Sequence, residues 1–315
     1  MESRLRFEEL TFPVGASSVG RFAQRCVCWL VCMSMLSAAE IRIDHATVAG
    51  RELNAIRAAL AKVGIASEYG GPHANHATEM ALVSFPDGSY LELIALQPHA
   101  DAAAAKAHYW SRFIEGDAGP CAWAVRSHDV AAETRRLRQA GIEVAAPSKS
   151  GRARPDGVRL DWETAKVGPG ATGTFFPFLI RDITSRLDRA WPTGKPNAPE
   201  FLGVAKVVIA VRDLPAASQI YSRAYGLPAP ALLADPSFEA NLAIFPGTPV
   251  VLAAPLDGRS WLAARLKKFG EAPCAFVLNR GPNAGDFPAK PGTVRLSEQV
   301  SWFDEAALGW RLGVE

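Results

Sequence analysis

The sequence has 315 residues, of which 49% are hydrophobic and 21% charged, so it holds ample material for a globular core. The formal net charge is +2 and no long block of like charges occurs, which excludes the basic surface typical of nucleic-acid-binding proteins. Length alone allows one to three domains.

The segment from Arg21 to Ala39 has the pattern of a secretory signal, with basic residues, an apolar run and a small-residue site before Glu40. The run is shorter than the about 20 apolar residues that a membrane span needs. We therefore expect export to the periplasm, with residues 1–39 removed and no membrane span. A true start at Met33 or Met35 would delete the signal and leave a cytoplasmic protein.

Five cysteines are present, and three of them lie in this N-terminal segment. The other two, Cys121 and Cys274, fall deep within predicted strands. That placement does not suit a zinc pair, and no pattern supports a disulfide between them.

The first predicted elements form the order strand, helix and three strands. A glycine, Gly64, closes the helix. The last two strands form a hairpin, because an Asp-Gly pair between apolar runs is tight-turn chemistry. The predicted ranges are 41–48, the helix 52–63, and 65–69, 79–85 and 89–96.

The same order recurs along the chain. A connecting helix at 100–114 leads to a second copy, with strands at 121–126, 142–145, 157–162 and 175–180 and a helix at 129–140. A Pro-rich linker precedes a third copy, with a strand at 204–211, a helix at 215–225 and a hairpin at 242–245 and 250–254. A fourth copy opens at 272–277 and degenerates. The repeats predict an α+β protein of four βαβββ modules paired into two curved mixed sheets.

The second strand of the first hairpin carries a carboxylate in an apolar run. Alternation places Tyr90, Glu92 and Ile94 on one face of this strand and the remaining apolar residues on the other. Because burying an unpaired carboxylate is costly, we expect Glu92 to face a cleft. The nearest predicted partners are His45, His73 and His76.

Several short motifs resemble the vicinal oxygen chelate superfamily, specifically its glyoxalase-like branch (the glyoxalase, bleomycin resistance and dioxygenase type). They are Ile43-Asp-His45, Gly70-Gly-Pro-His73, Tyr90-Leu-Glu-Leu-Ile94, Arg154-Pro-Asp-Gly-Val-Arg-Leu160 and Pro177-Phe-Leu-Ile180. The resemblance implies paired βαβββ modules around a cleft, with a divalent metal held from the first and last strands of a module. Those positions are His45 and Glu92.

The chain departs from that pattern in the other modules. The corresponding positions of the second module fall at Pro120 or Ala122 and near Phe178, none of which binds metal. The third copy has Lys206 in place of His45, and we expect this lysine to form a salt bridge. We accordingly expect a glyoxalase-like domain at 41–188, a linker at 189–200 and a degenerate second domain at 201–315.

The predicted site combines a metal centre with a substrate wall. His45, Glu92 and either His73 or His76 are the candidate ligands for Fe(II), Mn(II), Zn(II) or Ni(II), with Glu92 also the candidate catalytic residue. The candidate substrate-binding residues are Tyr90, Arg154, Arg159 and Trp162. An arginine there would either pair with a substrate carboxylate or phosphate or remain an exposed charge at the end of its strand.

Two functions remain open from the sequence. One is a metal-dependent lyase, isomerase or dioxygenase acting on a small oxygenated molecule, and the other is a non-catalytic binding protein with a vestigial metal site. A glyoxalase I-type reaction would need a second base opposite Glu92, and the second module shows none. The expected partner is a small-molecule ligand, and the chain is expected to be a monomer or homodimer.

Overall fold

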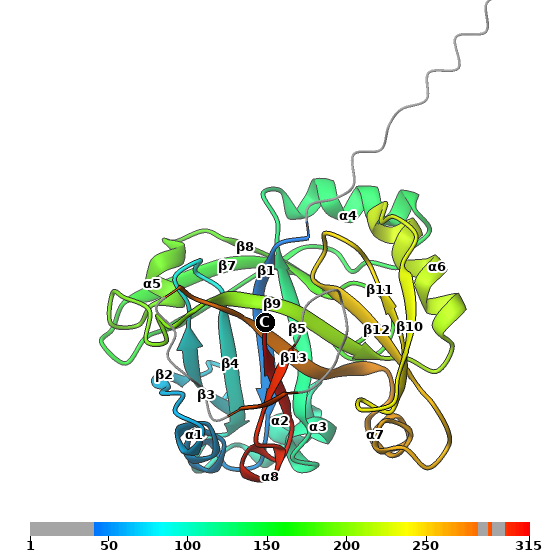
Figure 1. Cartoon of the computed structure of the whole chain (residues 1–315). Helices are drawn as coiled ribbons and strands as arrows, with labels where there is room; N and C mark the ends of the chain where they lie inside the picture. The colour runs from blue at the N-terminus through cyan, green and yellow to red at the C-terminus, as the bar shows by residue number, and fades with distance from the viewer. Residues whose placement is uncertain (1–40, 283–288, 292–299) are drawn as a thin grey trace, which may run out of the picture. The chain divides into compact units, whose positions relative to one another are not determined.

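Four strand-rich modules follow one another along the chain (Figure 1). The structure, a computed structural model, describes residues 41–282, 289–291 and 300–315. The predicted signal segment lies outside these residues. The described residues contain no helix that is both long enough and apolar enough to cross a membrane.

The first two modules occupy the N-terminal half. The first consists of β1 (Ile43–Ala49), α1 (Leu53–Lys62), β2 (Glu68–Pro72), β3 (Thr78–Ser84) and β4 (Tyr90–Leu96). The connection is formed by α2 (Ala102–Ala107) and α3 (Ser111–Glu115). The second consists of β5 (Gly119–Arg126), α4 (Val130–Gln139), β6 (Ser148–Ala153), β7 (Arg159–Ala165) and β8 (Phe178–Asp182), and is followed by α5 (Arg186–Ala190).

The last two modules repeat this order with changes. The third consists of β9 (Phe201–Ala210), α6 (Leu214–Tyr225), β10 (Ala231–Asp235), β11 (Ala240–Ile244) and β12 (Val250–Pro255), followed by α7 (Trp261–Phe269). The fourth consists of β13 (Ala272–Arg280), β14 (Ala289–Pro291), β15 (Ser301–Phe303), α8 (Glu305–Leu308) and β16 (Arg311–Val314).

Two eight-stranded mixed sheets result, and they have the same topology. The strand order is β2-β3-β4-β1-β5-β8-β7-β6 in the first sheet and β10-β11-β12-β9-β13-β16-β15-β14 in the second. In each sheet the first strands of the two modules pair antiparallel at the centre, as β1 with β5 and β9 with β13. The predicted α+β class with paired βαβββ modules is confirmed.

The helix boundaries follow from local chemistry. Asp129 caps α4 by accepting a hydrogen bond from the Ala132 amide at 2.9 Å, and Asp213 caps α6 in the same way. Gly226 ends α6 in the left-handed region at φ 64°, which glycine adopts without strain.

Two predicted elements were wrong. The connecting helix at 100–114 is broken at His108, whose backbone is extended, and the break lets the Trp110 indole donate to the Thr172 carbonyl at 2.8 Å. The strand predicted at 142–145 is a single β-bridge between Val144 and Val167, and the strand is formed later, by β6. The prediction also omitted β10.

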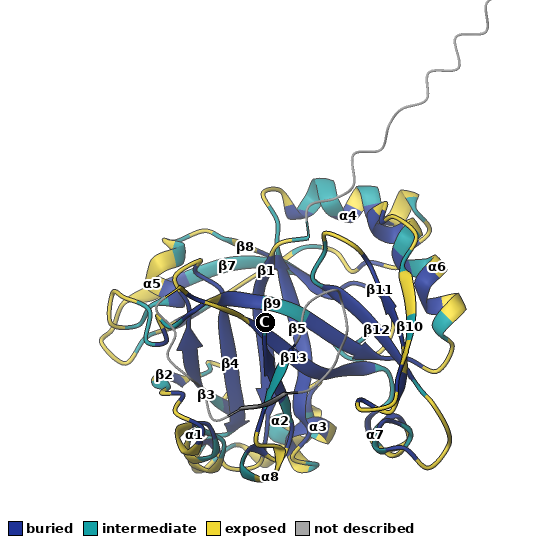
Figure 2. Ribbon diagram, in the orientation of Figure 1, coloured by how far each residue is buried: buried dark blue, intermediate teal, exposed yellow. Residues whose placement is uncertain are grey.

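The main hydrophobic core lies between the two sheets, which belong to one compact unit, Ser37–Glu315 (Figure 2). Ala46 and Val48 of β1 and Leu91 and Leu93 of β4 enter this core from the first sheet. From the second sheet and its helices come, among others, Phe201, Val207, Ile209, Tyr221, Leu252 and Phe276. The other face of the first sheet is therefore free to form a cavity.

The corresponding face of the second sheet is filled with side chains. Phe238 lies 5.2 Å from Trp261 and 5.5 Å from Trp302 between ring centroids. Leu262 and Leu266 of α7 pack into the same cluster. The second sheet thus keeps the topology of the first while burying the face that forms the cavity there.

Candidate functional site

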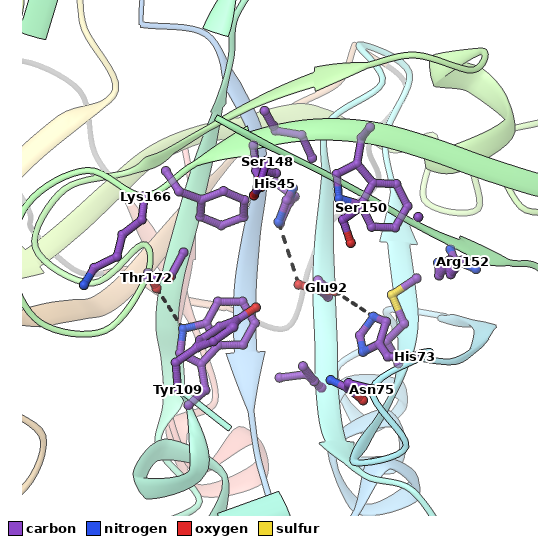
Figure 3. A pocket seen from close by; sticks show the side chains of 18 of the residues that line it. His45, His73, Asn75, Glu92, Tyr109, Ser148, Ser150, Arg152, Lys166 and Thr172 are labelled. Carbon is purple, nitrogen blue, oxygen red and sulfur yellow. Dashed lines mark hydrogen bonds and ion pairs between the residues drawn. The ribbon is translucent and has the colours of Figure 1, made fainter. Parts of the chain in front are cut away.

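The concave face of the first sheet encloses a cavity of about 380 Å³. Both modules contribute to its walls (Figure 3). Its aromatic and other apolar lining residues include Met80, Tyr90, Ile94, Tyr109, Trp110, Trp162, Phe178 and Ile180. Its polar lining residues include His45, His73, Asn75, Glu92, His108, Ser148, Ser150, Arg152, Thr164, Lys166 and Arg189.

Glu92 reaches the cavity because β4 alternates as its sequence predicts. Tyr90, Glu92 and Ile94 line the cavity, whereas Leu91 and Leu93 enter the core. The parallel pairing of β1 with β4 places Thr47 opposite Glu92. The Thr47 hydroxyl donates to Glu92 Oε2 at 3.2 Å, which holds the carboxylate from the β1 side.

Two histidines face this carboxylate from opposite sides (Figure 3). His45 Nε2 lies 3.8 Å from Glu92 Oε2, and His73 Nε2 lies 3.6 Å from Glu92 Oε1. Both separations exceed hydrogen-bonding distance. Each of the two imidazole nitrogens thus approaches a different oxygen of Glu92 without hydrogen-bonding to it.

The far side of each imidazole is held by another hydrogen bond. Asp44 Oδ1 lies 2.6 Å from His45 Nδ1, and Thr78 Oγ1 lies 2.8 Å from His73 Nδ1. An ionised carboxylate only accepts, so His45 Nδ1 carries a proton and Nε2 is the nitrogen that faces Glu92.

Asp44 is fixed in its ionised form by two arginines. Burial acts to raise the pKa of this carboxyl, but Arg189, the hydrogen bond from His45 and Arg186 together hold the pKa well below its usual value. Arg189 Nη2 lies 2.9 Å from Asp44 Oδ2, and Arg189 also donates to the Tyr90 hydroxyl at 2.5 Å. The anchoring of His45 therefore extends into α5.

Burial keeps His73 and His108 neutral near pH 7. Burial lowers the pKa of His73, and the opposing effect of Glu92 does not restore it. Burial, with a contribution from His73, lowers the pKa of His108 to about 4. Neutral imidazoles are the form that binds metals.

A model of the glyoxalase-like domain matches residues 43–225, which is more than half of the chain. The chain belongs to the glyoxalase-like family. The matched range covers the whole first sheet and continues through β9 and α6, past the boundary at 188 that the sequence suggested. The resemblance to this branch of the vicinal oxygen chelate superfamily is thereby confirmed.

Solved structures similar to this glyoxalase-like chain support its fold. A hypothetical protein from Staphylococcus aureus matches 87% of this chain and 99% of its own, with a TM-score of 0.61 and 13% identity. A variant of 4-hydroxymandelate synthase from Streptomyces coelicolor matches 76% of this chain and 71% of its own, with a TM-score of 0.50 and 17% identity. Such low identities show the fold alone. No curated protein sequence matches this chain significantly.

The glyoxalase-like fold brings some of the predicted site residues together. His45, His73, Glu92, Tyr90 and Trp162 all line the cavity. His76 does not: it is exposed in the turn between β2 and β3, with a left-handed φ of 56°. Of the two candidate loop histidines, His73 is therefore the one beside Glu92.

The predicted arginines lie elsewhere. Arg154 is paired with Asp156, and Arg159 is exposed and paired with Asp161 at 2.8 Å. Neither lines the cavity, because each is bound by an aspartate of its own hairpin. The arginine that does line it is Arg152.

Sequence reasoning missed Asp44, His108 and Arg152. Arg152 was not predicted as a site residue because the strand was expected at 142–145. The strand that forms is β6, and the alternation of Ser148, Ser150 and Arg152 along it places all three side chains at the cavity. His108 lies within the predicted helix at 100–114, and the break in that helix places it at the cavity instead.

A divalent metal, which the family resemblance implies, suits the donors of this cavity. Two imidazole nitrogens and one carboxylate form the ligand set typical of Fe(II) oxygenases and of several Zn(II) and Mn(II) sites. Ligands bound to one such ion lie about 3.0–3.4 Å apart, slightly closer than the 3.6 and 3.8 Å separations here. Within the described residues no three such side chains already converge on a single point. The donor chemistry fits, and binding one ion would require these three side chains to move closer together.

Proposed function

We propose that the chain is a glyoxalase-like enzyme whose first-sheet cavity binds a small oxygenated organic molecule beside a divalent metal held by His45, His73 and Glu92. The observation that carries the proposal is the presentation of two oriented Nε2 atoms to one buried carboxylate. The hydrogen bonds at both Nδ1 atoms support it, because such partners orient metal-binding imidazoles.

The bound metal would polarise a carbonyl or enediolate oxygen of the substrate or bind dioxygen beside it. The protein itself would supply orientation and a dry environment. Phe178 and Tyr90 flank the His45 ring at centroid distances of 5.3 and 4.9 Å, and so limit its movement. Their apolar surfaces exclude water from the parts of the His45 ring that they cover.

The cavity favours some reactions over others. Glu92 is the one carboxylate among the described residues that line it. A glyoxalase I-type proton shuttle between two opposed carboxylates is therefore not supported. The reactions that fit are lyase, isomerase or dioxygenase steps that need a single carboxylate ligand, with imidazole or substrate oxygen handling protons.

Metal content tests this proposal. Protein purified without an affinity tag is analysed by inductively coupled plasma mass spectrometry as wild type and as His45→Ala, His73→Ala and Glu92→Ala. The matched control is His76→Asn, because asparagine tolerates the left-handed backbone and the side chain lies outside the cavity. Near-stoichiometric metal in wild type and control, lost in the other three, is the expected result.

A wild type that holds no metal and resists reconstitution with Fe(II), Mn(II), Zn(II) or Ni(II) would overturn the metalloenzyme. The chain would then be a binding protein that uses the same cavity without metal chemistry. If metal is present, the next step is a substrate screen with vicinal diols, 2-oxo aldehydes and 2-oxo acids.

We also propose that the region 201–315 acts as a structural partner of the first sheet. Val251 lies opposite Val208 in the register that Glu92 takes opposite Thr47. Lys206 takes the place of His45 and pairs with Glu315 at 2.9 Å, as the sequence predicted. Among the residues that the structure describes, these substitutions and the aromatic filling leave the second sheet without the donors of a metal site.

A further inference from the structure

Arg152 is a buried cation at the cavity wall, and none of the described carboxylates pairs with it. The residue is 3% exposed, and no ion pair to it occurs among the described residues. Its Nη1 donates to the Gly70 carbonyl at 2.6 Å. Its Nη2 is buried and finds no hydrogen-bond partner in the described part of the chain.

The position of Arg152 follows from the curvature of the first sheet. β6 and β2 are the two edge strands of that sheet, at opposite ends of its strand order. The hydrogen bond from Arg152 to Gly70 joins these edges, and Pro155 also approaches Gly71 closely. The guanidinium is therefore held in place by the closing of the sheet.

An arginine in this state is costly unless a ligand completes its hydrogen bonds. Burial lowers the pKa of Arg152, while Tyr90 and Glu92 oppose that effect. Leaving a buried donor of a charged group unsatisfied is expensive. Elsewhere in the cavity, Arg189 is fully paired with Asp44 and Asp182, so it does not share this need.

The surroundings of Arg152 favour an anion of limited charge. Ser148 and Ser150 lie on the same face of β6, and Figure 3 shows Arg152 and Lys166 on opposite sides of Glu92. No ion pair of Lys166 occurs among the described residues. Glu92 in the same cavity repels a dianion more than a monoanion, and the guanidinium fork matches a carboxylate.

We propose that Arg152 receives a carboxylate of the substrate, so that the site acts on a small organic acid with an apolar body. The body lies against the aromatic wall that includes Tyr109, Trp162 and Phe178. This inference rests on the proposed function in taking the cavity as the substrate site. It does not need the metal.

The test compares acids with their uncharged amides by titration calorimetry. The probes are phenylacetate, hexanoate and lactate, each beside its amide, with phenyl phosphate as a further arm. Each is titrated into wild type, Arg152→Met and the matched control Arg154→Gln, with and without a chelator. Arg154 is two residues away on the same hairpin, outside the cavity and paired with Asp156.

We expect wild type to bind at least one of the acids roughly tenfold more tightly than its amide. Arg152→Met should remove that preference and leave amide binding unchanged, and Arg154→Gln should behave as wild type. The preference should persist in the presence of chelator, which separates Arg152 from any metal. If Arg152→Met fails to fold, Arg152→Lys replaces it and should weaken acid binding while leaving amide binding unchanged, because the ammonium lacks the planar fork.

Three outcomes would overturn the inference. They are equal binding of every acid and its amide by wild type, an acid preference retained in the Arg152 variant, and tighter binding of phenyl phosphate than of any carboxylate. Absence of metal together with an Arg152-dependent acid preference would refute the metalloenzyme and leave this inference standing. Metal binding without an acid preference would refute this inference and leave the metalloenzyme proposal standing.

Discussion

Asp44 and His45 are consecutive residues of β1, and yet their side chains are hydrogen-bonded to each other at 2.6 Å. In a regular strand, successive side chains point to opposite faces. The pairing of β1 with β5 has a register shift between Ile43 and His45, and such bulges redirect side chains. The bulge thus allows one strand to supply both a candidate ligand and the carboxylate that orients it.

Replacing Asp44 with asparagine should destabilise the protein strongly. Arg186 and Arg189 would lose their shared carboxylate, and breaking a buried ion pair in this way costs about 3–5 kcal/mol. Urea denaturation at pH 7 measures the loss. The control Asp156→Asn, which removes the exposed partner of Arg154, should lose much less.

The decrease of the unfolding free energy at acid pH should also change in Asp44→Asn. Because the folded pKa of Asp44 is depressed, its stabilisation is present above the unfolded value of 3.8 and is lost as pH falls through the folded pKa. Asp44→Asn should therefore flatten the decline of stability below about pH 4. An unchanged decline would show that the ion pairs of Asp44 contribute nothing to the stability of the fold.

His108 should make the protein less stable between pH 6.5 and pH 4. Its folded pKa is lowered to about 4 from 6.5, so the unfolded chain binds a proton in this window that the folded chain does not. The loss should be roughly 1–2 kcal/mol, below the full value for such a shift, since the ring is partly exposed to solvent.

The variant His108→Phe should show a shallower pH dependence of the unfolding free energy in that window. Phenylalanine keeps a ring against Tyr109, whose centroid lies 4.5 Å from that of His108. His128→Gln, a change at an exposed histidine, serves as control and should follow wild type. Equal slopes in all three proteins would refute the assignment.

The sequence predicted the parts of the site that depend on regular alternation. Glu92 and Tyr90 reach the cavity because β4 is a regular strand with an Asp-Gly turn before it. Apolar residues alternate with them, and burial of one face fixes the register. The prediction of His45 as a candidate ligand rested on its place on the first strand of the module, one of the two ligand positions that the family resemblance implies.

The parts of the site that the sequence did not predict depend on irregular backbone and on contacts between residues far apart in the sequence. The bulge at Asp44 and the break at His108 leave no periodic signal. Arg152 acquires its role only because the sheet curls until β6 meets Gly70. The filling of the second sheet by Trp261 and Trp302 likewise depends on packing between segments far apart in sequence.

Asn197, in the predicted linker, should contribute measurably to stability. Its Oδ1 accepts from the Ser84 amide at 2.7 Å and its Nδ2 donates to the Leu82 carbonyl at 2.9 Å, which ties the linker to β3. Asn197→Ala should cost about 1–3 kcal/mol, because these backbone groups lose their partner. Asn54→Ala, at an exposed helix position, should stay within about 0.5 kcal/mol. Equal effects would mean that the linker is held by apolar contacts alone.

The two sheets should respond differently when one phenylalanine is removed from β8 and another from the turn between β10 and β11. Phe238 is buried among Trp261 and Trp302 in the second sheet, so Phe238→Ala should cost about 3–5 kcal/mol. Phe178 lines the open cavity beside His45, so Phe178→Ala should cost less stability and weaken ligand binding more.

Denaturation curves and titrations with metal and phenylacetate, both at a temperature where each variant is folded, separate the two effects. Phe238→Ala should keep the affinities of wild type, because its side chain fills the second sheet and does not line the cavity. A folded Phe238→Ala protein that no longer bound metal or acid would show that the second sheet takes part in the site. That result would require the region 201–315 to be assigned a functional as well as a structural role.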